Sequence, residues 1–336
     1  MTPRRLLDLA RRVGSADACL AEVRAGRAGS DADREFARKI DASELEAALN
    51  ACGARFVVPG MNEYLRGLEE LSDPPAALFV RGAPLDDLTE SVSMVGARNC
   101  SPAGRDAARQ IGRGLASAGV CVVSGGARGI DSASHEGALA AAGPTLAVLG
   151  SGIDVAYPQR NRKLLADIEA HGSVVSEYPP GVPAEPFRFP ARNRIVAALG
   201  GALVVVEGAE GSGSLITADH ALELGRTVFA VPGPVTSPLA QVPLALIREG
   251  AVLIRDSNDL LQDLGYEARA ASRAVAGLTL AEEAALDSVA GATLPEDVAR
   301  ETGLEVPEAV SLLLRLEMKG LIRSIGGRYE RRTLGE

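Results

Sequence analysis

The sequence predicts an α/β protein: an extended Rossmann-like, doubly wound and mostly parallel sheet, with a small helical N-terminal domain and a C-terminal winged-helix domain. Three observations support this fold class. Short apolar runs alternate with helical patterns in the middle of the chain, the segment before them is polar and mostly helical in pattern, and the last segment ends in a two-stranded ribbon pattern. A chain of 336 residues is long enough for two or three domains.

The composition is that of a soluble globular protein. Hydrophobic residues make up 46% of the chain and charged residues 24%, so a largely disordered chain is excluded and a sizeable core is expected. The formal net charge of −9 argues against a dedicated DNA-binding domain, because such domains are usually basic. Most of the acidic excess lies after residue 200, so a local basic site earlier in the chain stays possible.

Cysteine spacing and hydropathy predict where the protein works. The 4 cysteines form no C-x-x-C pair, so neither a zinc site nor a disulfide framework is predicted. The first residues are basic and lack an apolar leader core. No apolar stretch reaches the length that spans a bilayer. We therefore expect a cytoplasmic protein without membrane association.

Residues 1–84 are predicted to form the small, mostly helical N-terminal domain. Apolar residues at helical spacing occur at 6–10 and again at 43–49. Short apolar stretches follow at 56–58 and 78–80, and prolines and glycines punctuate the region around them.

Residues 85–267 are predicted to form the extended Rossmann-like domain. Its strands are expected at seven apolar runs, 92–95, 120–123, 146–149, 174–175, 203–206, 228–231 and 252–254. Helical patterns lie between these runs, at 104–118, 132–142, 160–170, 194–199, 215–224 and 242–248. Continuous apolar strands separated by helices are typical of a parallel sheet that is covered on both faces.

Residues 276–336 are predicted to form the winged-helix-like domain. Helical patterns are followed by a hairpin pattern with two glycines at its turn, the ranges being 280–289, 295–301, 307–319 and 321–331. The linker at 268–276 is rich in alanine, and we expect it to be exposed.

Glycine-rich turns follow several predicted strands and indicate a phosphate-binding surface. The carboxyl ends of parallel strands meet at one edge of a sheet, where glycines permit close backbone approach and helix N-termini favour anions. Gly96 and Arg98 follow the first strand, the loop 124–131 with Arg128 follows the second, and 211–217 follows the fifth. Purely structural turns are the alternative interpretation.

A basic and aromatic cluster at 187–194 is the strongest local feature. It contains Arg188, Arg192 and Arg194, two of the chain's 6 phenylalanines and no acidic residue. Arginine pairs with phosphate and phenylalanine stacks on a base. The alternative is that Phe187 and Phe189 are core anchors and that Arg192 forms an ion pair with Glu177 or Glu185.

Catalysis, a nucleotide cofactor and a metal are not predicted. The dinucleotide-binding spacing G-x-G-x-x-G is absent after the first strand, and no acidic residue follows the second strand where a ribose would need it. Asp131 is instead expected to cap its helix. His135 lies four residues further on, so the two side chains could face each other, but we interpret it as a buried structural histidine. The serines lack a histidine partner in a nucleophile pattern.

Ordered motifs along the chain resemble the DNA-processing protein A (DprA, or Smf) family. They cover roughly residues 60–255 and comprise 96–98, 124–131 with His135, Ala138 and Leu139, 157–158, 176–181, 189–194, 212–218 and 231–233. The resemblance implies a cytoplasmic bacterial protein without catalysis, and a sterile-alpha-motif-like N-terminal domain. Such a protein binds single-stranded DNA in the cleft of the Rossmann domain, forms a homodimer through that domain, contacts RecA, protects incoming DNA and loads RecA on it during natural transformation.

The resemblance also implies a set of DNA-binding residues. Arg98 would hold backbone phosphate, Phe187 or Phe189 would stack a base, and the loops around them would line the same cleft. The complete set is Gly96, Arg98, Ser124, Gly125, Arg128, Gly129, Phe187, Phe189, Arg192, Asn193, Arg194, Ser212, Gly213, Ser214 and Thr217.

Some positions depart from the family pattern. Ala97 stands where Ser or Thr is usual, Ser134 where Ala is usual, and Ala191 where a basic residue is frequent. The segment 237–247 replaces a more polar stretch and lies where the family dimerises and meets RecA.

Two other classes are weighed. A nucleotide-monophosphate phosphoribohydrolase (LOG-like) enzyme shares a Rossmann core, but the turn 208–213 lacks that group's catalytic motif. A transcription regulator would read DNA with the helix at 307–319. This helix carries two basic and two acidic residues, a charge balance that does not favour binding in the major groove. We expect the winged helix to be an accessory or protein-contact domain.

Overall fold

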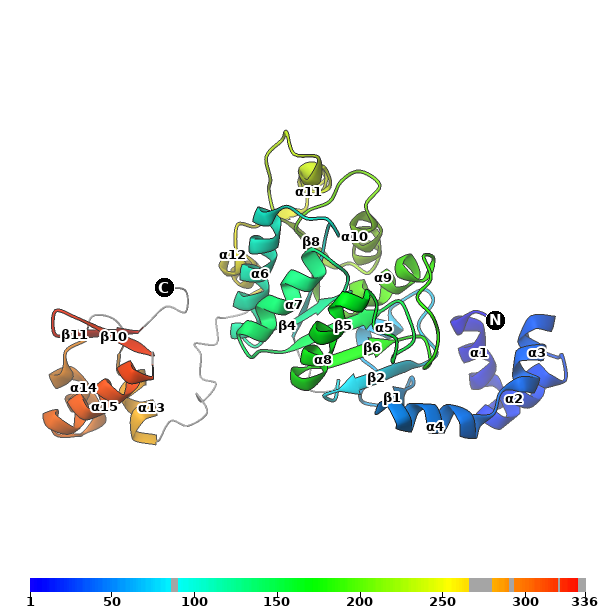
Figure 1. Ribbon diagram of the computed structural model, residues 1–336, viewed down its shortest axis with the longest axis horizontal. Helices are drawn as coiled ribbons and strands as arrows, with labels where there is room; N and C mark the ends of the chain where they lie inside the picture. Colours follow the sequence, from blue (N-terminus) through cyan, green and yellow to red (C-terminus); the bar gives the residue numbers. More distant parts are fainter. Residues whose placement is uncertain (86–89, 266–279, 290–292, 320, 332–336) are drawn as a thin grey trace. The chain divides into compact units, whose positions relative to one another are not determined.

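The computed structural model describes residues 1–85, 90–265, 280–289, 293–319 and 321–331 of the chain (Figure 1). Its contacts divide the chain into two compact units, Met1–Arg269 and Ala270–Glu336. Within the described residues, no helix is both long enough and apolar enough to cross a membrane.

A mostly parallel sheet organises the first unit, which confirms the predicted fold class. Within the described residues it contains nine strands in the order β1-β2-β6-β5-β4-β3-β7-β8-β9. The seven strands from β3 to β9 run parallel, whereas β1 pairs antiparallel with β2, and β2 with β6. The bounds are β1 Arg55–Val57, β2 Leu78–Gly82, β3 Ser91–Val95, β4 Cys121–Ser124, β5 Thr145–Leu149, β6 Ser173–Ser176, β7 Ala202–Val205, β8 Thr227–Ala230 and β9 Val252–Leu253.

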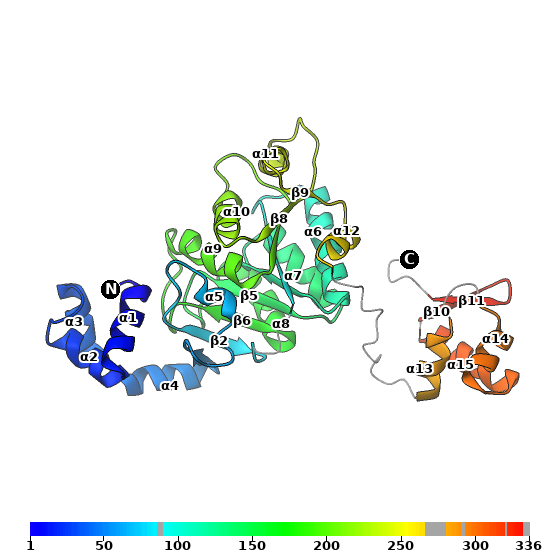
Figure 2. The same ribbon diagram turned by 180° about the vertical axis from the view of Figure 1, so that it is seen from behind.

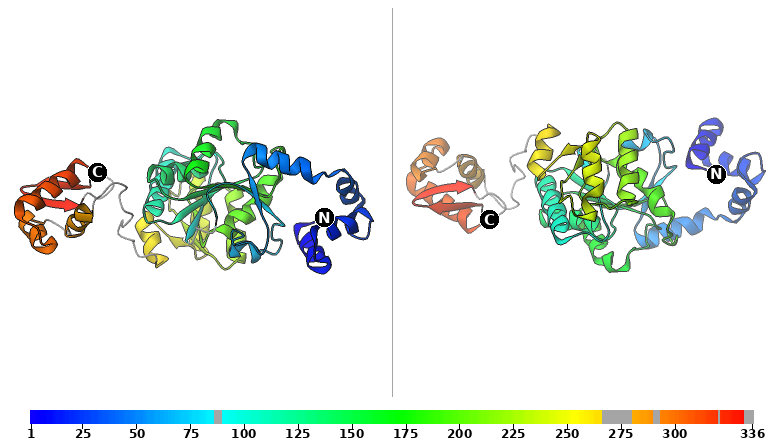
Figure 3. Two further views of the ribbon diagram at one scale, coloured as in Figure 1. Left: turned by 90° about the horizontal axis from the view of Figure 1, so that it is seen from below. Right: turned by 90° about the horizontal axis from the view of Figure 1, so that it is seen from above.

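Helices cover both faces of this sheet (Figure 3). On one face, Ile111 and Leu260 pack with Met94 of β3, and this layer contains α6 Pro102–Ser117, α7 Ile130–Ala140, α8 Arg162–His171 and α12 Ser257–Asp263. On the other face, Ile195 and Leu246 pack with the strand residues of a second cluster, and this layer contains α5 Arg66–Glu69, α9 Arg188–Leu199, α10 Gly213–Glu223 and α11 Gln241–Arg248. Short 3-10 turns lie at Gln159–Asn161 and Pro238–Ala240.

The sheet begins earlier than the predicted boundary at residue 85. Strands β1 and β2 lie inside the segment that the sequence assigns to the helical N-terminal domain, and β2 joins the sheet beside β6. The physical reason is burial, because Val57, Leu78 and Val80 belong to the same apolar cluster as the central strands. Helix α9 also begins six residues before the predicted start at Arg194, since Pro190 is tolerated in the first turn, where no intrahelical donor is needed.

Four helices precede the sheet, and they are blue in Figure 2. They are α1 Pro3–Val13, α2 Ala16–Arg24, α3 Asp31–Lys39 and α4 Ala42–Cys52. A small cluster of Leu9, Cys19, Val23 and Ala37 forms the core of the first three. Serine at the N-cap of α2 and of α3 accepts from the helix backbone, which fixes where each helix begins.

The second unit has the predicted order of three helices and a hairpin. Its elements are α13 Leu280–Asp287, α14 Pro295–Thr302, α15 Val306–Met318, β10 Ile322–Ile325 and β11 Arg328–Arg331. The core includes Val298, Leu313 and Tyr329. The linker at 268–276, predicted to be exposed, lies outside the described residues.

Candidate nucleic-acid interface

The topological switch point of the sheet lies between β3 and β7. The chain runs from β3 outward through β4, β5 and β6, and then returns to the other side of β3 as β7. In such sheets the crevice at this point takes the ligand, with its phosphate at a helix N-terminus. Here the carboxylate of Glu207 accepts from Ser101 N at 2.8 Å and from Ser101 Oγ at 2.6 Å, beside the start of α6. The chain itself therefore supplies an anion to that helix end.

A basic pocket of about 410 Å³ lies at the carboxyl ends of β3, β4 and β5. No acidic residue lines this pocket. The lining residues are Arg98, Gly125, Ala127, Arg128, Gly150, Tyr157, Pro158, Arg160, Phe189 and Arg192. Within the described part of the chain, Arg98, Arg128 and Arg160 have no ion-pair partner, whereas other arginines nearby are paired. An uncompensated group of guanidinium ions attracts anions.

Phe189 lies at the centre of an aromatic and cationic stack in this pocket. Its ring centroid is 5.2 Å from that of Tyr157, with a tilt of 35°, and Arg98 Cζ lies 5.1 Å above its centroid. Phe187 is 64% exposed, and Arg188 Cζ lies 5.1 Å from its ring. Because neither phenylalanine belongs to a core cluster of the described residues, the core-anchor interpretation is wrong.

Arg192 is buried and bonds to the backbone. Its Nη1 donates to the carbonyl of Gly125 at 2.6 Å and to the carbonyl of Val148. The alternative interpretation, an ion pair of Arg192 with Glu177 or Glu185, is therefore wrong. Those carboxylates pair with its neighbours in the cluster, Glu177 with Arg194 at 2.6 Å and Glu185 with Arg188 at 3.0 Å.

Arg192 and Asp131 perturb each other in the buried layer below the pocket. Burial lowers the pKa of Arg192 to about 10, although the charge of Asp131 opposes this shift. Burial also raises the pKa of Asp131 above its ordinary value, and here the charge of Arg192 opposes the shift. Each ion thus offsets part of the other's cost of burial. Asp131 does not cap its helix as predicted, because its Oδ2 accepts from Ala127 N in the preceding loop at 3.3 Å.

Interior side chains bind three consecutive carbonyls of the loop after β4. Arg192 donates to Gly125 O, and Asn161 Nδ2 donates to Gly126 O at 2.9 Å and to Ala127 O at 3.3 Å. Ser132 Oγ also donates to Ala127 O, at 2.5 Å. Because these oxygens are engaged inside the protein, they present little negative charge to an anion in the pocket.

Two glycines allow the loops after β3 and β4 to approach each other. Gly129 has a φ of +79°, and a Cβ there would lie 2.2 Å from Ala97 O. A Cβ on Gly96 would lie 2.6 Å from Ile130 Cγ1. Any side chain at either position would therefore push the two loops apart, as the glycine-rich motifs predict.

The remaining predicted residues lie beside the pocket or below it. Ser124 is buried and donates to Met94 O at 2.6 Å, while Ser214 and Thr217 are buried in α10. Asn193 Nδ2 donates to Gly213 O at 3.2 Å, which joins α9 to the start of α10. The structure thus brings Arg98, Gly125, Arg128, Phe189 and Arg192 together in the pocket, and it leaves the segment 212–217 outside its lining.

Comparisons with known proteins decide the family. The sequence profile of the DNA recombination-mediator protein A family matches residues 55–265, and that of the DprA winged helix domain matches residues 269–328. The chain belongs to the DNA recombination-mediator protein A family. Membership confirms the resemblance that the ordered motifs indicate.

Relatives of this DNA recombination-mediator protein A chain span most of its length. Protein Smf of Escherichia coli K12 is 38% identical, over 82% of this chain and 77% of that protein. The putative DNA processing protein DprA of Mycobacterium tuberculosis is 37% identical, over 96% of this chain and 89% of that protein.

Two solved structures resemble the fold of this family member. DNA processing protein A of Streptococcus pneumoniae gives a TM-score of 0.69 at 36% identity, covering 77% of this chain and 91% of that one. DNA processing protein A of Helicobacter pylori, solved to describe its single-stranded DNA binding mode, gives 0.57 at 27% identity, covering 63% and 95%.

The pocket lining contains five residues outside the predicted set, which are Ala127, Gly150, Tyr157, Pro158 and Arg160. Tyr157 and Arg160 come from the segment between β5 and α8 and line the pocket with Arg98. The motif at 157–158 points to Tyr157, whereas the pattern around Arg160 predicts the start of a helix.

His135 is fully buried, and its Nδ1 lies 2.7 Å from Thr145 Oγ1 rather than beside Asp131. Burial lowers the pKa of His135 to about 3.

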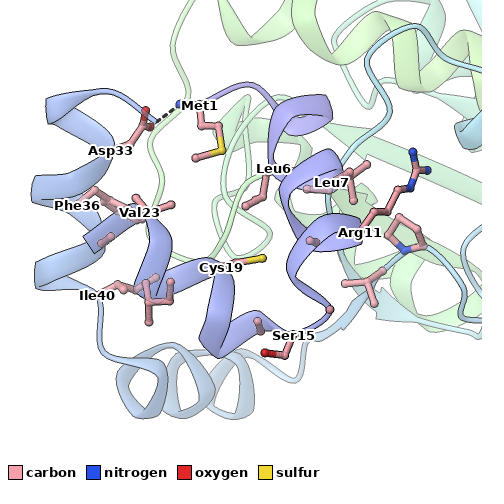
Figure 4. A pocket seen from close by; sticks show the side chains of 18 residues that line it. Met1, Leu6, Leu7, Arg11, Ser15, Cys19, Val23, Asp33, Phe36 and Ile40 are labelled. Atoms are coloured by element: carbon pink, nitrogen blue, oxygen red, sulfur yellow. Dashed lines mark hydrogen bonds and ion pairs between the residues drawn. The ribbon is translucent and has the colours of Figure 1, made fainter. Parts of the chain in front are cut away.

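A larger hollow of about 810 Å³ in this family member lies elsewhere (Figure 4). It is lined mainly by apolar residues of α1 to α3, including Leu6, Cys19 and Phe36, and it shares no lining residue with the basic pocket. In the described part of the chain, no cluster of three or more His, Cys, Asp or Glu side chains could hold a metal ion.

Proposed function

We propose that this chain is a recombination mediator that binds single-stranded DNA and acts by binding rather than by catalysis. The observation that carries the proposal is the basic pocket, where Arg98 and Arg128 have no ion-pair partner within the described residues and share the lining with Tyr157 and Phe189. Cations for the backbone and a flat aromatic ring for a base suit a single strand of any sequence. The single-stranded DNA binding mode of the Helicobacter pylori relative supports the proposal.

The predicted site residues fall into two groups, those proposed to contact DNA and those that hold the surrounding loops in place. Arg98 and Arg128 bind phosphates, and Phe189 stacks a base, with exposed Phe187 further along the strand. Buried and half-buried side chains hold the loops in place, and the glycines allow these loops to approach. This supporting set is Gly96, Ser124, Gly125, Gly129, Arg192, Asn193, Arg194, Ser214 and Thr217. Ser212 and Gly213 at the start of α10 extend the surface.

The double variant Arg98→Gln/Arg128→Gln tests the proposal directly. Each lost phosphate contact on a single strand lowers the slope of log affinity against log salt by about 0.7, so the slope for oligo-dT should fall by about 1.4. The control is Arg113→Gln, which removes one exposed charge from α6 and should leave the slope unchanged. An unchanged affinity and slope in the double variant would contradict the cleft assignment.

We further propose a cytoplasmic homodimer that contacts RecA and loads it during natural transformation. The family resemblance supports RecA loading and transformation. Edge strand β9 supports the dimer, because Val252 and Leu253 are 36% and 46% exposed beside unpaired backbone. Two linked clefts would bind one strand with avidity.

Light scattering should give twice the mass of one chain, and a monomer would contradict the proposed homodimer. The immobilised chain should retain RecA, and no retention would contradict the proposed RecA contact.

A further inference from the structure

The segment between β5 and α8 forms one wall of the basic pocket. Tyr157 and Arg160 line the pocket from this segment, together with Arg98 and Arg128 from the loops after β3 and β4. Arg160 is exposed, and within the described residues it has no ion-pair partner. Arg162, two residues further on, is equally exposed but does not line the pocket.

Asn161 fixes this wall against the neighbouring loop. Its side chain is 8% exposed and donates to Gly126 O, Ala127 O and Ser132 Oγ. Its backbone N–H also donates to Pro158 O at 2.9 Å, which closes the turn that contains Arg160. The backbone of Arg160 is therefore held in place before any ligand arrives, so an anion that binds there has less chain ordering to offset.

The chemistry of the pocket matches a single nucleotide. Its volume of about 410 Å³ falls in the range of small-ligand sites. Tyr157 is 47% exposed, and its tilted ring extends the aromatic surface of Phe189. Several positively charged arginines line this space, and the lining contains no carboxylate. A phosphate bound between these arginines would reduce their mutual repulsion.

We propose that Tyr157 and Arg160 complete a one-nucleotide subsite in which Arg160 binds the phosphate of the nucleotide whose base stacks on Tyr157 and Phe189. This inference rests on the proposed single-strand binding and deepens it. It assigns a phosphate contact and a base contact to a segment outside the glycine-rich turns. In this subsite Arg160 adds a third cation to Arg98 and Arg128 along the backbone of the bound strand.

The matched pair Arg160→Gln and Arg162→Gln tests the phosphate contact. Each variant removes one exposed charge, and the two positions are only two residues apart, so long-range attraction falls equally. Arg160→Gln should lower the affinity of the full chain for oligo-dT about tenfold, the loss typical of a charged hydrogen bond, and lower the salt slope by about 0.7. Arg162→Gln should keep the wild-type slope. Circular dichroism spectra of both variants should match the wild type, because neither side chain is buried.

Tyr157→Leu tests the base contact by a different readout. It should weaken oligo-dT binding about tenfold, since stacking is worth about 1–3 kcal/mol per base, and it should leave the salt slope unchanged. Tyr157→Phe should restore the affinity, because the ring remains. On an abasic strand of equal length, Tyr157→Leu and the wild type should bind equally.

The outcomes separate the two proposals. If Arg160→Gln and Arg162→Gln behave alike while Arg98→Gln/Arg128→Gln loses affinity and slope, the subsite is overturned and single-strand binding stands. Equal loss by Tyr157→Leu on abasic and normal strands also overturns the base contact. If the wild type itself shows no salt-dependent binding of oligo-dT, the proposed function fails first.

Discussion

Replacing Arg192 by Met should destabilise the Rossmann-like unit by about 1–3 kcal/mol for each buried carbonyl that loses its donor, the usual cost of an unsatisfied buried acceptor. The side chain is only 5% exposed. Its loss leaves the carbonyls of Gly125 and Val148 without their donor and leaves Asp131 without its nearby positive charge.

The pH dependence of this variant follows from Asp131. Arg192 holds down a pKa that burial raises, so its removal should raise the folded-state pKa of Asp131 further. A carboxyl group whose pKa is higher in the folded than in the unfolded state costs least when it is protonated in both states, and it destabilises as pH rises through the folded value. The deficit of Arg192→Met should therefore be smaller at acid pH than at neutral pH.

Urea unfolding of the full chain, followed by circular dichroism, checks both statements. Arg162→Met is the control, because this exposed arginine has no ion pair within the described residues, and its loss should change stability by less than about 0.5 kcal/mol. Adding Asp131→Asn to Arg192→Met should recover part of the loss at neutral pH. Equal midpoints for Arg192→Met and Arg162→Met would refute the buried-support role.

Gly129→Ala should cost at least about 2 kcal/mol, because two penalties add. A non-glycine residue in a strained backbone region costs about 1–3 kcal/mol, and Gly129 has φ +79° with ψ −123°. Forced overlap in a packed site costs a further 1–3 kcal/mol or so, and the new Cβ would lie 2.2 Å from Ala97 O.

Gly119→Ala separates these two penalties in the same urea experiment. Gly119 has φ +82°, but a Cβ there would meet no atom within 4 Å. Only the backbone cost remains, about 1–2 kcal/mol. Equal losses in the two variants would mean that the close approach of the loops after β3 and β4 does not constrain Gly129.

The central strands of the sheet were predictable because they are buried on both faces. Each predicted apolar run from 92–95 to 252–254 overlaps a strand of the structure, since a parallel strand under two helix layers excludes polar residues. The sequence assigns the residues of β1 and β2 to the N-terminal domain, because their short apolar stretches stand among prolines and glycines. Which edge such a stretch joins is decided by distant partners, here β6, that local pattern does not reveal.

The site was predictable only in part. Arg98 and Arg128 follow glycine-rich strand ends, and strand order brings such loops together. The direction in which Arg192 and Arg194 point depends on where α9 begins, because each helical residue turns by about 100°. That start lies at Arg188, so one arginine is directed under the loop after β4 and the other to Glu177. Tyr157 and Arg160 lie in an irregular segment, which carries no periodic signal.

Glu207 has a consequence for how this architecture can be used. Since its carboxylate already accepts from Ser101 at the start of α6, the crevice between β3 and β7 holds an internal substitute for a phosphate. In the proposed mode of binding, a polyanion meets a like charge at that helix end and the arginines of the basic pocket after β3, β4 and β5. The proposed site is therefore not the start of α6, which Glu207 occupies, but the group of loops beside it.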